Sequence, residues 1–318
     1  MNILVTGCAG FIGFSLIKEL VKDKNNKIIG IDNMNNYYDK KLKNDRLKLI
    51  IKKIKFYNID ICNKKKINEV FKSNKIETCF HFAAQAGVRF SFINPDAFFK
   101  SNILGSYNIL NACRLNRVKN FFFSSSSSVY GNSLKFPQKE EHNTDQQLSF
   151  YATTKKSNEL MVYTFSHLYS IKTTVLRFFT VYGPFGRPDM AFFNFANSIK
   201  NNKPVKLYNN GKNLRDYTYI DDVIISIKKI FKKKCRKEAL NFEIINICSS
   251  NPIKTNDVIK IFESKMRKKA IVNKIKAVKG DVFKTCGDIT QIKKYNNNDF
   301  TSITNGIDKY IDWFNDYY

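Results

Sequence analysis

The segment that follows the first apolar run restricts the fold of this chain more than any other feature. Residues 7–13 read Gly-Cys-Ala-Gly-Phe-Ile-Gly, directly after Ile3-Leu4-Val5 and before an amphipathic stretch that reaches about Val21. Glycines at this spacing let a strand turn sharply into a helix and let a pyrophosphate approach the positive end of that helix. An ordinary strand-to-helix turn does not need three glycines at these positions. Residues 7–13, here named the glycine turn, therefore predict a dinucleotide-binding site.

An acidic residue then indicates which dinucleotide is bound. Asp32 ends the second predicted strand and lies 32 − 13 = 19 residues after Gly13. A carboxylate at this point accepts hydrogen bonds from the adenosine ribose hydroxyls and repels a 2′-phosphate, which favours NAD over NADP. Asp60, after the third predicted strand, has two open interpretations: a contact to the adenine edge, or an N-cap for the next helix.

The first half of the chain alternates short apolar strands with amphipathic helices, as expected of a parallel sheet covered on both faces. The predicted strands are 2–6, 27–31, 54–58, 78–82, 120–124 and 173–178, and the predicted helices are 64–73, 96–115 and 151–168. Beyond Tyr182, prolines shorten the elements, and helices are expected at 189–200, 222–231 and 255–266. We therefore predict an α/β fold. It has a Rossmann-type doubly wound parallel sheet in an NAD-binding domain (1–178) and a smaller C-terminal α/β substrate-binding cap (179–318), with the chain free to cross between them.

A tyrosine and a lysine on one helix form the candidate catalytic pair. Tyr151 and Lys155 are four residues apart, so they share one face of the predicted helix. A free phenol has a pKa of about 10, too high for a base at neutral pH. A nearby ammonium and the positive nicotinamide ring stabilise the phenolate, which makes Tyr151 a workable general base.

A run of five serines stands where open α/β sheets bind their ligands. The apolar strand at 121–123 is followed by serines 124–128, which places hydroxyls at the carboxyl edge of the sheet. One of these hydroxyls can bind the substrate oxygen and relay its proton to Tyr151. A serine-rich turn without a role explains some of the five but not all.

The net charge of +27 comes from lysines spread along the whole chain, so we interpret it as a solvated surface and expect no nucleic-acid partner. The seven cysteines are scattered and show no paired spacing, which favours free thiols in a reducing cytoplasm and no metal site. No apolar run approaches the roughly 20 residues of a membrane helix, and no signal peptide is visible, so a soluble protein is expected.

Together these motifs resemble the extended short-chain dehydrogenase/reductase family, and within it the nucleotide-sugar epimerases, UDP-glucuronate 4-epimerases most of all. The resemblance rests on the glycine turn, Ser126 and the pair Tyr151/Lys155, and it extends from Met1 to about Asp288. Five further stretches agree with it: 81–89, 102–105, 176–184, 186–191 and 215–222.

This resemblance implies a role for each matching residue. The residues expected to hold NAD are Gly7, Gly10, Phe11, Ile12, Gly13, Asp32, Asn33, Asp60, Ile61, Ala83, Ala84, Asn102, Ser124, Tyr151 and Lys155. Ser126 takes the catalytic Ser/Thr position, with Ser127 as its nearest rival. Thr180 and Arg187 are expected to face the sugar and its carboxylate, and Arg89 and Arg215 the sugar or the diphosphate. The planar fork of arginine suits both anions, although surface solvation is the alternative for Arg187 and Arg215.

The activity implied is NAD-dependent 4-epimerisation of a UDP-sugar, UDP-glucuronate to UDP-galacturonate, through transient oxidation at C4. Related dehydratases carry Asp-Glu after the catalytic Thr, and decarboxylases usually retain the Glu, whereas this chain has Ser127-Ser128. Hydroxyls do not replace a carboxylate as acid or base at neutral pH without strong activation. The alternatives are a UDP-glucose or UDP-N-acetylglucosamine 4-epimerase, a UDP-glucuronate decarboxylase, and, in a different class, a non-catalytic NAD- or nucleic-acid-binding protein. The resemblance also implies a homodimer, formed through the helices at 96–115 and 151–168, and a role in polysaccharide biosynthesis.

Overall fold

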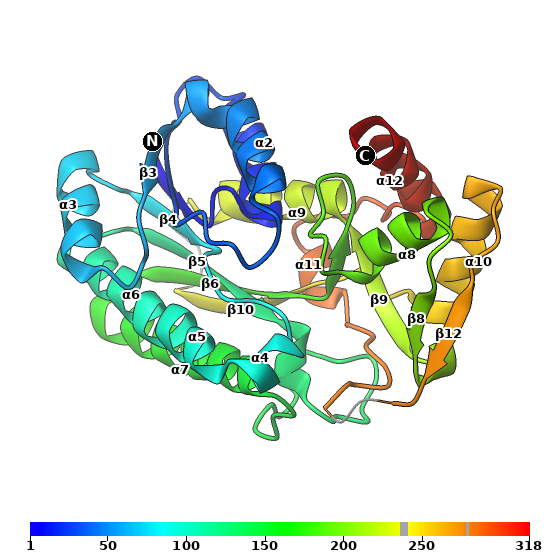
Figure 1. The fold of residues 1–318 in the computed structure, drawn as a ribbon. Coiled ribbons are helices and arrows are strands. Elements are labelled where there is room, and N and C mark those ends of the chain that lie inside the picture. The colour runs from blue at the N-terminus through cyan, green and yellow to red at the C-terminus, as the bar shows by residue number, and fades with distance from the viewer. Residues whose placement is uncertain (236–240, 278–279) are drawn as a thin grey trace.

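The computed structural model describes residues 1–235, 241–277 and 280–318. A seven-stranded sheet forms its centre, in the order β10-β6-β5-β4-β1-β2-β3, with every neighbouring pair parallel (Figure 1). Its strands are β1 (Asn2–Thr6), β2 (Lys27–Asp32), β3 (Lys55–Asn58), β4 (Thr78–His81), β5 (Asn120–Ser126), β6 (Lys172–Phe178) and β10 (Phe242–Ile247). The predicted doubly wound, Rossmann-type sheet is confirmed.

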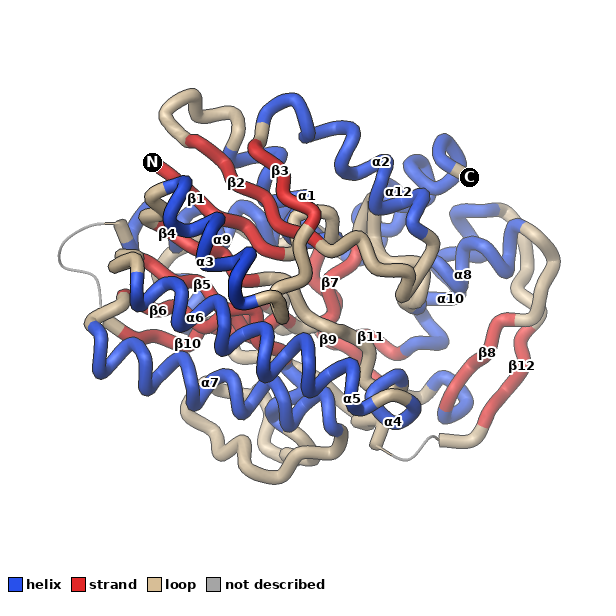
Figure 2. The backbone as a smooth tube through the Cα atoms, turned by 60° about the vertical axis from the view of Figure 1, so that its left-hand side comes forward, coloured by secondary structure: helices blue, strands red, loops and turns tan. Residues whose placement is uncertain are grey.

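Helices cover both faces of this sheet because successive side chains of a strand point to opposite faces. Leu4 of β1 belongs to the hydrophobic cluster of one face, which α3 (Lys64–Asn74), α6 (Ser106–Leu115) and α7 (Phe150–Tyr169) cover (Figure 2). Ile3 and Val5 belong to the cluster of the other face, with α1 (Phe11–Leu20) and α9 (Ile220–Lys234). Burial on both faces accounts for the nearly continuous apolar runs in the strands.

A smaller part beside the sheet forms the cap. It contains a three-stranded sheet, β11-β9-β7, a two-stranded sheet, β12-β8, and three helices that share the hydrophobic cluster with α1 and α9 (Figure 1). Its elements are β7 (Thr180–Tyr182), α8 (Ala191–Lys200), β8 (Val205–Tyr208), β9 (Leu214–Tyr219), β11 (Pro252–Lys254), α10 (Thr255–Met266), β12 (Val272–Ile275) and α12 (Ile303–Tyr317). Rings of Phe192, Phe262 and Tyr310 contact one another edge-on and join α8, α10 and α12.

Several elements differ from the sequence predictions. Helices α2 (Lys40–Ile50) and α12 and strand β10 were not predicted. The helix expected at 96–115 consists of α5 (Pro95–Phe98), a π-helical segment η2 (Phe99–Gly105) and α6. The remaining short elements are η1 (Ile51–Lys53), α4 (Phe90–Ile93), η3 (Ser127–Tyr130), η4 (Asn209–Gly211) and α11 (Thr290–Lys293).

Strand β10 lies after the predicted domain boundary at residue 178, yet it pairs with β6 at the edge of the large sheet. The chain therefore passes from the sheet into the cap and back again. The assignment of NAD binding to 1–178 and of substrate binding to 179–318 stays a prediction. Within the described residues, no helix combines the length and the apolar character that crossing a bilayer requires.

The strand order also positions the site. From β1 the chain proceeds to β2 and β3 on one side, and then to β4, β5 and β6 on the other. Loops that follow β1 and β4 therefore diverge at the carboxyl edge of the sheet, which is where sheets of this topology form a ligand crevice.

Candidate active site

A cavity of about 700 Å³ opens at this edge of the sheet, within the size range of small-molecule sites. The predicted site residues that line it are Gly7, Gly10, Phe11, Ile12, Gly13, Asp32, Asn33, Ile61, Ala83, Ala84, Arg89, Ser124, Ser126, Ser127, Tyr151, Lys155, Thr180 and Arg187. Three predicted residues do not line it: Asp60, Asn102 and Arg215. The fold thus gathers most of the predicted site from loops that are far apart in the sequence.

The glycine turn needs its glycines for steric reasons. Gly7 has a φ of +71°, and a Cβ atom there would lie 2.8 Å from the backbone nitrogen of Ala83. A Cβ atom on Gly13 would lie 2.2 Å from the carbonyl oxygen of Gly7. Helix α1 begins directly after Gly10, and no side chain caps its first turn. Close backbone approach and a helix N-terminus without a side-chain cap are the features that a pyrophosphate requires, so the turn fits a dinucleotide.

Asp32 connects this turn to the next loop. It is 8% exposed, and its carboxylate accepts hydrogen bonds from the backbone nitrogens of Ala9 (3.1 Å) and Met34 (2.9 Å). Asp60 lies outside the cavity lining and accepts a hydrogen bond of 3.0 Å from Asn33, which does line the cavity. The N-cap of α3 is Asn63, so the N-cap interpretation of Asp60 was wrong. In this structure Asp60 supports Asn33.

Asn102 lies behind the cavity, within the π-helical segment η2. It is fully buried, and its amide exchanges two hydrogen bonds with the backbone of Gln85, at 2.8 and 3.1 Å. Its Nδ2 also donates to Thr154 on α7 at 3.0 Å. Asn102 therefore fixes the loop after β4, which lines the cavity, to the helix that carries the candidate base. The sequence pattern placed this residue correctly on a helix, but only the packing shows which groups it connects.

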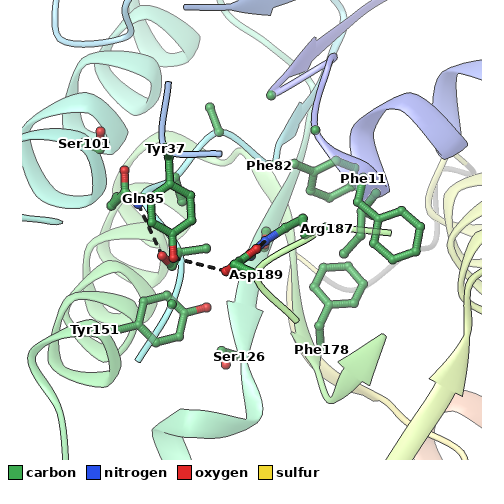
Figure 3. Close-up of a pocket in the computed structure, with 18 of the residues that line it drawn as sticks. Phe11, Tyr37, Phe82, Gln85, Ser101, Ser126, Tyr151, Phe178, Arg187 and Asp189 are labelled. Carbon is green, nitrogen blue, oxygen red and sulfur yellow. Dashed lines mark hydrogen bonds and ion pairs between the residues drawn. The ribbon is translucent and has the colours of Figure 1, made fainter. Parts of the chain in front are cut away.

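Tyr151 and Ser126 come together from α7 and β5, as Figure 3 shows. Burial raises the pKa of the Tyr151 phenol, while a hydrogen bond with Ser126 and the positive charge of Arg187 act to lower it. Ser126 also accepts a hydrogen bond from the backbone nitrogen of Ser128 at 3.1 Å, which ends β5 in a fixed turn. The Ser126 hydroxyl, which the sequence indicated, is therefore adjacent to the phenol. The effect of the Arg187 charge on the pKa of this phenol was not anticipated from the sequence.

Lys155 is 2% exposed and its Nζ donates to the carbonyl oxygen of Ser124 at 2.7 Å. Its ammonium lies 6.0 Å from the centre of the Tyr151 ring. Burial lowers the pKa of Lys155 to about 7, and the nearby carboxylate of Glu159 opposes this shift. Glu159 is one helical turn further along α7, so the same helix supplies the lysine and a charge that favours its protonated form.

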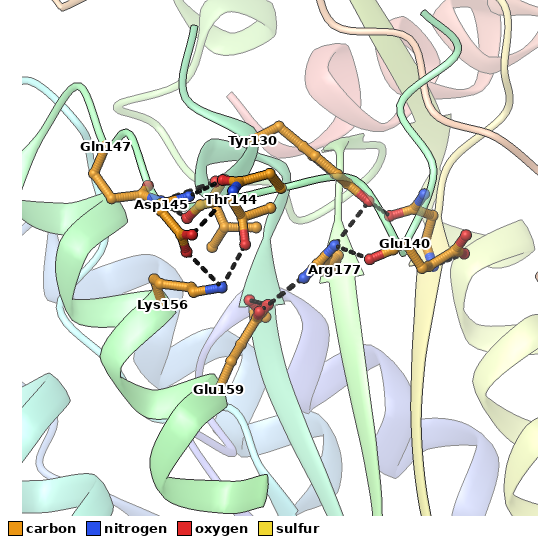
Figure 4. Close-up of polar contacts among 12 residues, drawn as sticks. Tyr130, Glu140, Thr144, Asp145, Gln147, Lys156, Glu159 and Arg177 are labelled. Atoms are coloured by element: carbon orange, nitrogen blue, oxygen red, sulfur yellow. Dashed lines mark hydrogen bonds and ion pairs between the residues drawn. The ribbon is translucent and has the colours of Figure 1, made fainter. Parts of the chain in front are cut away.

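Glu159 belongs to a buried polar network beneath the site (Figure 4). Arg177 on β6 donates to both of its carboxylate oxygens, at 3.0 and 2.9 Å, and the two side chains are only 2% and 4% exposed. Arg177 also donates to Tyr130 and to the carbonyl oxygen of Glu140, each at 3.0 Å. Ser125, next to Ser126, donates to the same carboxylate. The network joins the end of β5 to α7, so it holds the elements that carry Ser126 and Tyr151 together.

The two arginines expected at the sugar or the diphosphate converge on one carboxylate, which no local sequence pattern connects with either of them. Asp281 lines the cavity and pairs with Arg89 at 3.3 Å and with Arg215 at 2.8 Å. The Arg89 guanidinium also lies over the Tyr208 ring, 3.5 Å from its centre. Arg215 thus lies behind the cavity wall and contacts it only through its ion pair with Asp281, whereas Arg89 lines the cavity. Neither the surface-solvation interpretation of Arg215 nor direct lining describes its position.

Other lining residues escaped sequence reasoning as well, chiefly Tyr37 and Asp189. Asp189 forms an ion pair with Arg187 and accepts a hydrogen bond from the Tyr37 hydroxyl (Figure 3). Asp189 stands two residues after Arg187, so its proximity was available from the sequence. Tyr37 lies in the loop after β2, and no local pattern connects it with either residue. Surface solvation of Arg187 is not what the structure has, since its side chain is 22% exposed and lines the cavity.

A buried histidine beneath the glycine turn makes stability depend on pH. His81 is 1% exposed, its ring nitrogens bond to Thr6 (2.7 Å) and Ser106 (2.9 Å), and burial together with the charge of Lys155 lowers its pKa to about 3. Below a pH of about 6.5, the pKa of an unfolded histidine, the unfolded chain binds a proton at His81 that the folded chain does not bind. The free energy of unfolding therefore decreases as the pH falls from there toward 3. At pH 5 the loss is about 2 kcal/mol.

We expect His81→Gln to remove that dependence, since an amide does not titrate and still bonds to Thr6 and Ser106. Urea unfolding at pH 7.5 and pH 5 measures it. The free energy of unfolding of the variant is expected to fall by less than that of the parent protein, by about 2 kcal/mol. Equal falls in the two proteins would contradict the assignment to His81.

Residues 3–248 match the model of the NAD dependent epimerase/dehydratase family. The chain is 41% identical to "Protein CapI" of Staphylococcus aureus, over 100% of this chain and 99% of that protein. It is 40% identical to the UDP-glucuronate 4-epimerase of Thermodesulfobacterium geofontis, over 98% of this chain and 95% of that enzyme. Among solved structures, the UDP-glucuronic acid 4-epimerase of Bacillus cereus in complex with UDP-glucuronic acid and NAD superposes with a TM-score of 0.93 at 30% identity, over the full length of both chains.

Proposed function

The chain belongs to the NAD dependent epimerase/dehydratase family, and we propose that it interconverts UDP-glucuronate and UDP-galacturonate by inverting C4 of the sugar. It is an NAD-dependent isomerase of nucleotide sugars. One observation carries the proposed substrate: a single cavity brings Arg187, a carboxylate-binding side chain, next to Tyr151 and Ser126.

The lining of the cavity fits NAD. Backbone groups of the glycine turn and of the first turn of α1 would hold its pyrophosphate, because no Cβ atom intrudes there. Asp32 would bind the adenosine ribose, with Asn33 and Ile61 beside it. Bound at these residues, NAD would supply the hydride acceptor for C4 and, once reduced, the hydride donor to the opposite face of the ring, and would thus be regenerated in each turnover. We assign NAD binding to 1–178 and the sugar carboxylate to 179–318, while Tyr151 and Ser126 reach the sugar from the first part.

The chain itself moves one proton. Tyr151, as phenolate, takes the proton of the 4-hydroxyl, and Ser126 hydrogen-bonds to the same oxygen. A hydrogen bond with Ser126 and the charge of Arg187 act against the burial that raises the pKa of this phenol, and the Lys155 ammonium lies 6.0 Å from the centre of its ring. After the 4-keto sugar has turned over in the cap, the phenol returns the proton.

The carboxylate of the sugar needs a firm hold during this reaction, because a 4-keto-uronate readily loses CO₂. Arg187 and Thr180 line the cavity and would bind the carboxylate. Arg89 would face the diphosphate. Arg215 would act indirectly, by holding the Asp281 side chain near Arg89.

The cavity also argues against dehydration and decarboxylation. Among its described lining residues the carboxylates are Asp32, Asp189 and Asp281, and each already accepts a hydrogen bond or forms an ion pair. Ser127 and Ser128 follow Ser126 at the positions where related dehydratases carry Asp and Glu. Among the described residues, no carboxylate without a partner lines the cavity next to Ser126 to remove a second proton.

Incubation of the purified protein with UDP-glucuronate tests this function. We expect UDP-galacturonate as the product, with neither net NADH nor released CO₂. Initial rates with UDP-glucose and UDP-N-acetylglucosamine are expected to be lower. A UDP-pentose product with CO₂ would identify a decarboxylase instead, and a faster reaction with UDP-glucose would reassign the substrate.

We further propose a homodimer in a reducing cytoplasm, where the product would serve polysaccharide biosynthesis. Large apolar side chains are exposed along η2, α6 and α7, among them Leu104 (43%), Tyr107 (42%), Leu160 (59%) and Tyr163 (54%). Neighbouring helices with such a face fit a four-helix contact between two copies. All seven cysteines are free, as expected in that compartment.

A further inference from the structure

Arg187, the candidate carboxylate-binding residue, does not stand alone in the cavity. Its Nε donates to Oδ1 of Asp189 at 3.0 Å, and its Nη2 donates to Oδ2 of the same carboxylate. Burial acts to raise the pKa of Asp189, but the charge of Arg187 outweighs it and the pKa lies below its ordinary value. The pair is therefore a charged, two-point contact, which fixes the plane of the guanidinium group.

Asp189 is itself held by a residue from another part of the fold. Tyr37, in the loop after β2, donates its hydroxyl to Oδ2 of Asp189 at 3.1 Å, and the Arg187 guanidinium lies 5.9 Å from the centre of the Tyr37 ring (Figure 3). Gly87, in the loop after β4, makes room for this phenol, because a Cβ atom there would lie 2.4 Å from the Tyr37 hydroxyl oxygen. The loop after β2 thus meets the segment after β7 that carries Arg187 and Asp189, and the loop after β4 leaves room for this contact.

The hydrogen bonds to Asp189 occupy one edge of that group. They use Nε and Nη2, and within the described residues no hydrogen bond is formed by Nη1. A guanidinium group can bind a second carboxylate through the edge formed by Nη1 and Nη2. Because Arg187 lines the same cavity as Tyr151, this second edge is the one left for a ligand.

We propose that Asp189, supported by Tyr37, is a positioning residue that determines specificity for the sugar carboxylate by presenting the Nη1 edge of Arg187 to it. This inference rests on the proposed function. A neutral sugar has no carboxylate to form two hydrogen bonds with that edge, so the orientation of Arg187 does not strengthen its binding. Asp189 also gives Arg187 a counter-ion before the substrate enters.

Steady-state kinetics with UDP-glucuronate and UDP-glucose test the assignment. In Asp189→Ala we expect kcat/KM for UDP-glucuronate to fall about tenfold, mostly through KM. A freely rotating guanidinium group is less often oriented to form both hydrogen bonds with the sugar carboxylate. For UDP-glucose, kcat/KM is expected to fall by a clearly smaller factor, because a neutral sugar has no carboxylate to lose from the guanidinium group. Tyr37→Phe, which removes one hydrogen bond, is expected to lower kcat/KM for UDP-glucuronate in the same selective way by about threefold.

The double variant Asp189→Ala/Arg187→Ala separates orientation from general damage. If Asp189 acts through Arg187, its loss adds nothing once Arg187 is alanine, a non-additivity that double-mutant cycles detect. Arg187→Ala alone is expected to impair UDP-glucuronate more than UDP-glucose. Asp257→Ala, which removes the partner of Lys260 on the surface of α10, is the matched control and is expected to leave both substrates unaffected. Thermal unfolding and bound NAD are measured on every variant.

Equal losses on the two substrates, a gain on UDP-glucuronate, or a further loss in the Arg187→Ala background would each overturn the role of Asp189. Tyr37→Phe answers the same question if Asp189→Ala does not fold. The parent protein is measured with both substrates before any variant. If it converts UDP-glucose but not UDP-glucuronate, the proposed function is wrong, whatever the role of Asp189.

Discussion

Replacing Tyr151 with phenylalanine is expected to lower kcat by about a thousandfold, since general base catalysis contributes factors of this order. The phenol is the group within reach of Ser126 and under the charge of Arg187, and phenylalanine cannot accept the proton of the 4-hydroxyl. The ring itself is kept, and it contacts Phe98 edge-on, so the fold and the cavity wall are expected to remain. NAD is therefore expected to stay bound.

Initial rates and the NAD content of the purified variant measure this result. Tyr169→Phe is a matched control, because Tyr169 ends the same helix, is 43% exposed and does not line the cavity. It is expected to match the parent protein. Near-normal turnover in Tyr151→Phe would exclude this phenol as the base. Loss of NAD together with activity would indicate a structural role instead.

The second large effect concerns the ion pair between Arg177 and Glu159. In Arg177→Leu we expect the free energy of unfolding to fall by about 3–5 kcal/mol, because Glu159 would remain charged and buried without its partner. Glu159→Leu is expected to cost a similar amount for the same reason. Urea unfolding at pH 7 measures both.

The double variant Arg177→Leu/Glu159→Leu distinguishes a charge effect from simple loss of packing. Removal of both charges is expected to recover a large part of the stability, since a buried ion pair and an apolar pair of similar size often have similar free energies. Recovery is expected to be incomplete because Arg177 also donates to Tyr130 and to the backbone of Glu140. Additive losses in the double variant, or single losses below about 1 kcal/mol, would contradict this account.

Local patterns in the sequence predicted much of the fold. Glycines 7, 10 and 13, the acidic end of β2 and the i, i+4 pair on α7 depend on residues close together in the chain, so their spacing is sufficient. β10 could not be placed, because its position beside β6 depends on a chain reversal through the cap. α12 has the apolar spacing of an amphipathic helix, with Ile307, Ile311 and Phe314 buried, and this signal was available but not used.

The candidate site divides in the same way. Tyr151, Lys155, Ser126 and Arg187 were named from motifs, and all of them line the cavity. Asp60 and Asn102 were expected to hold NAD, which stays a prediction; in the structure they lie one contact behind residues that line the cavity. A motif identifies the residues that accompany a site, but it does not distinguish a residue on the cavity wall from one that supports it.

By itself, the sequence determined the chemistry that this chain can perform: a dinucleotide turn, a phenol with a lysine on one helical face, and hydroxyls at a strand end. The tertiary structure alone decided the partners of the charged groups, namely Asp281 between Arg89 and Arg215, and Tyr37 on Asp189. Tyr37 and Asp189 are 152 residues apart, and a contact at that separation leaves no periodic trace in the chain. Such contacts exist only because the fold brings loops of the large sheet and segments of the cap to one cavity, where burial then makes each unpaired charge costly enough to require a partner.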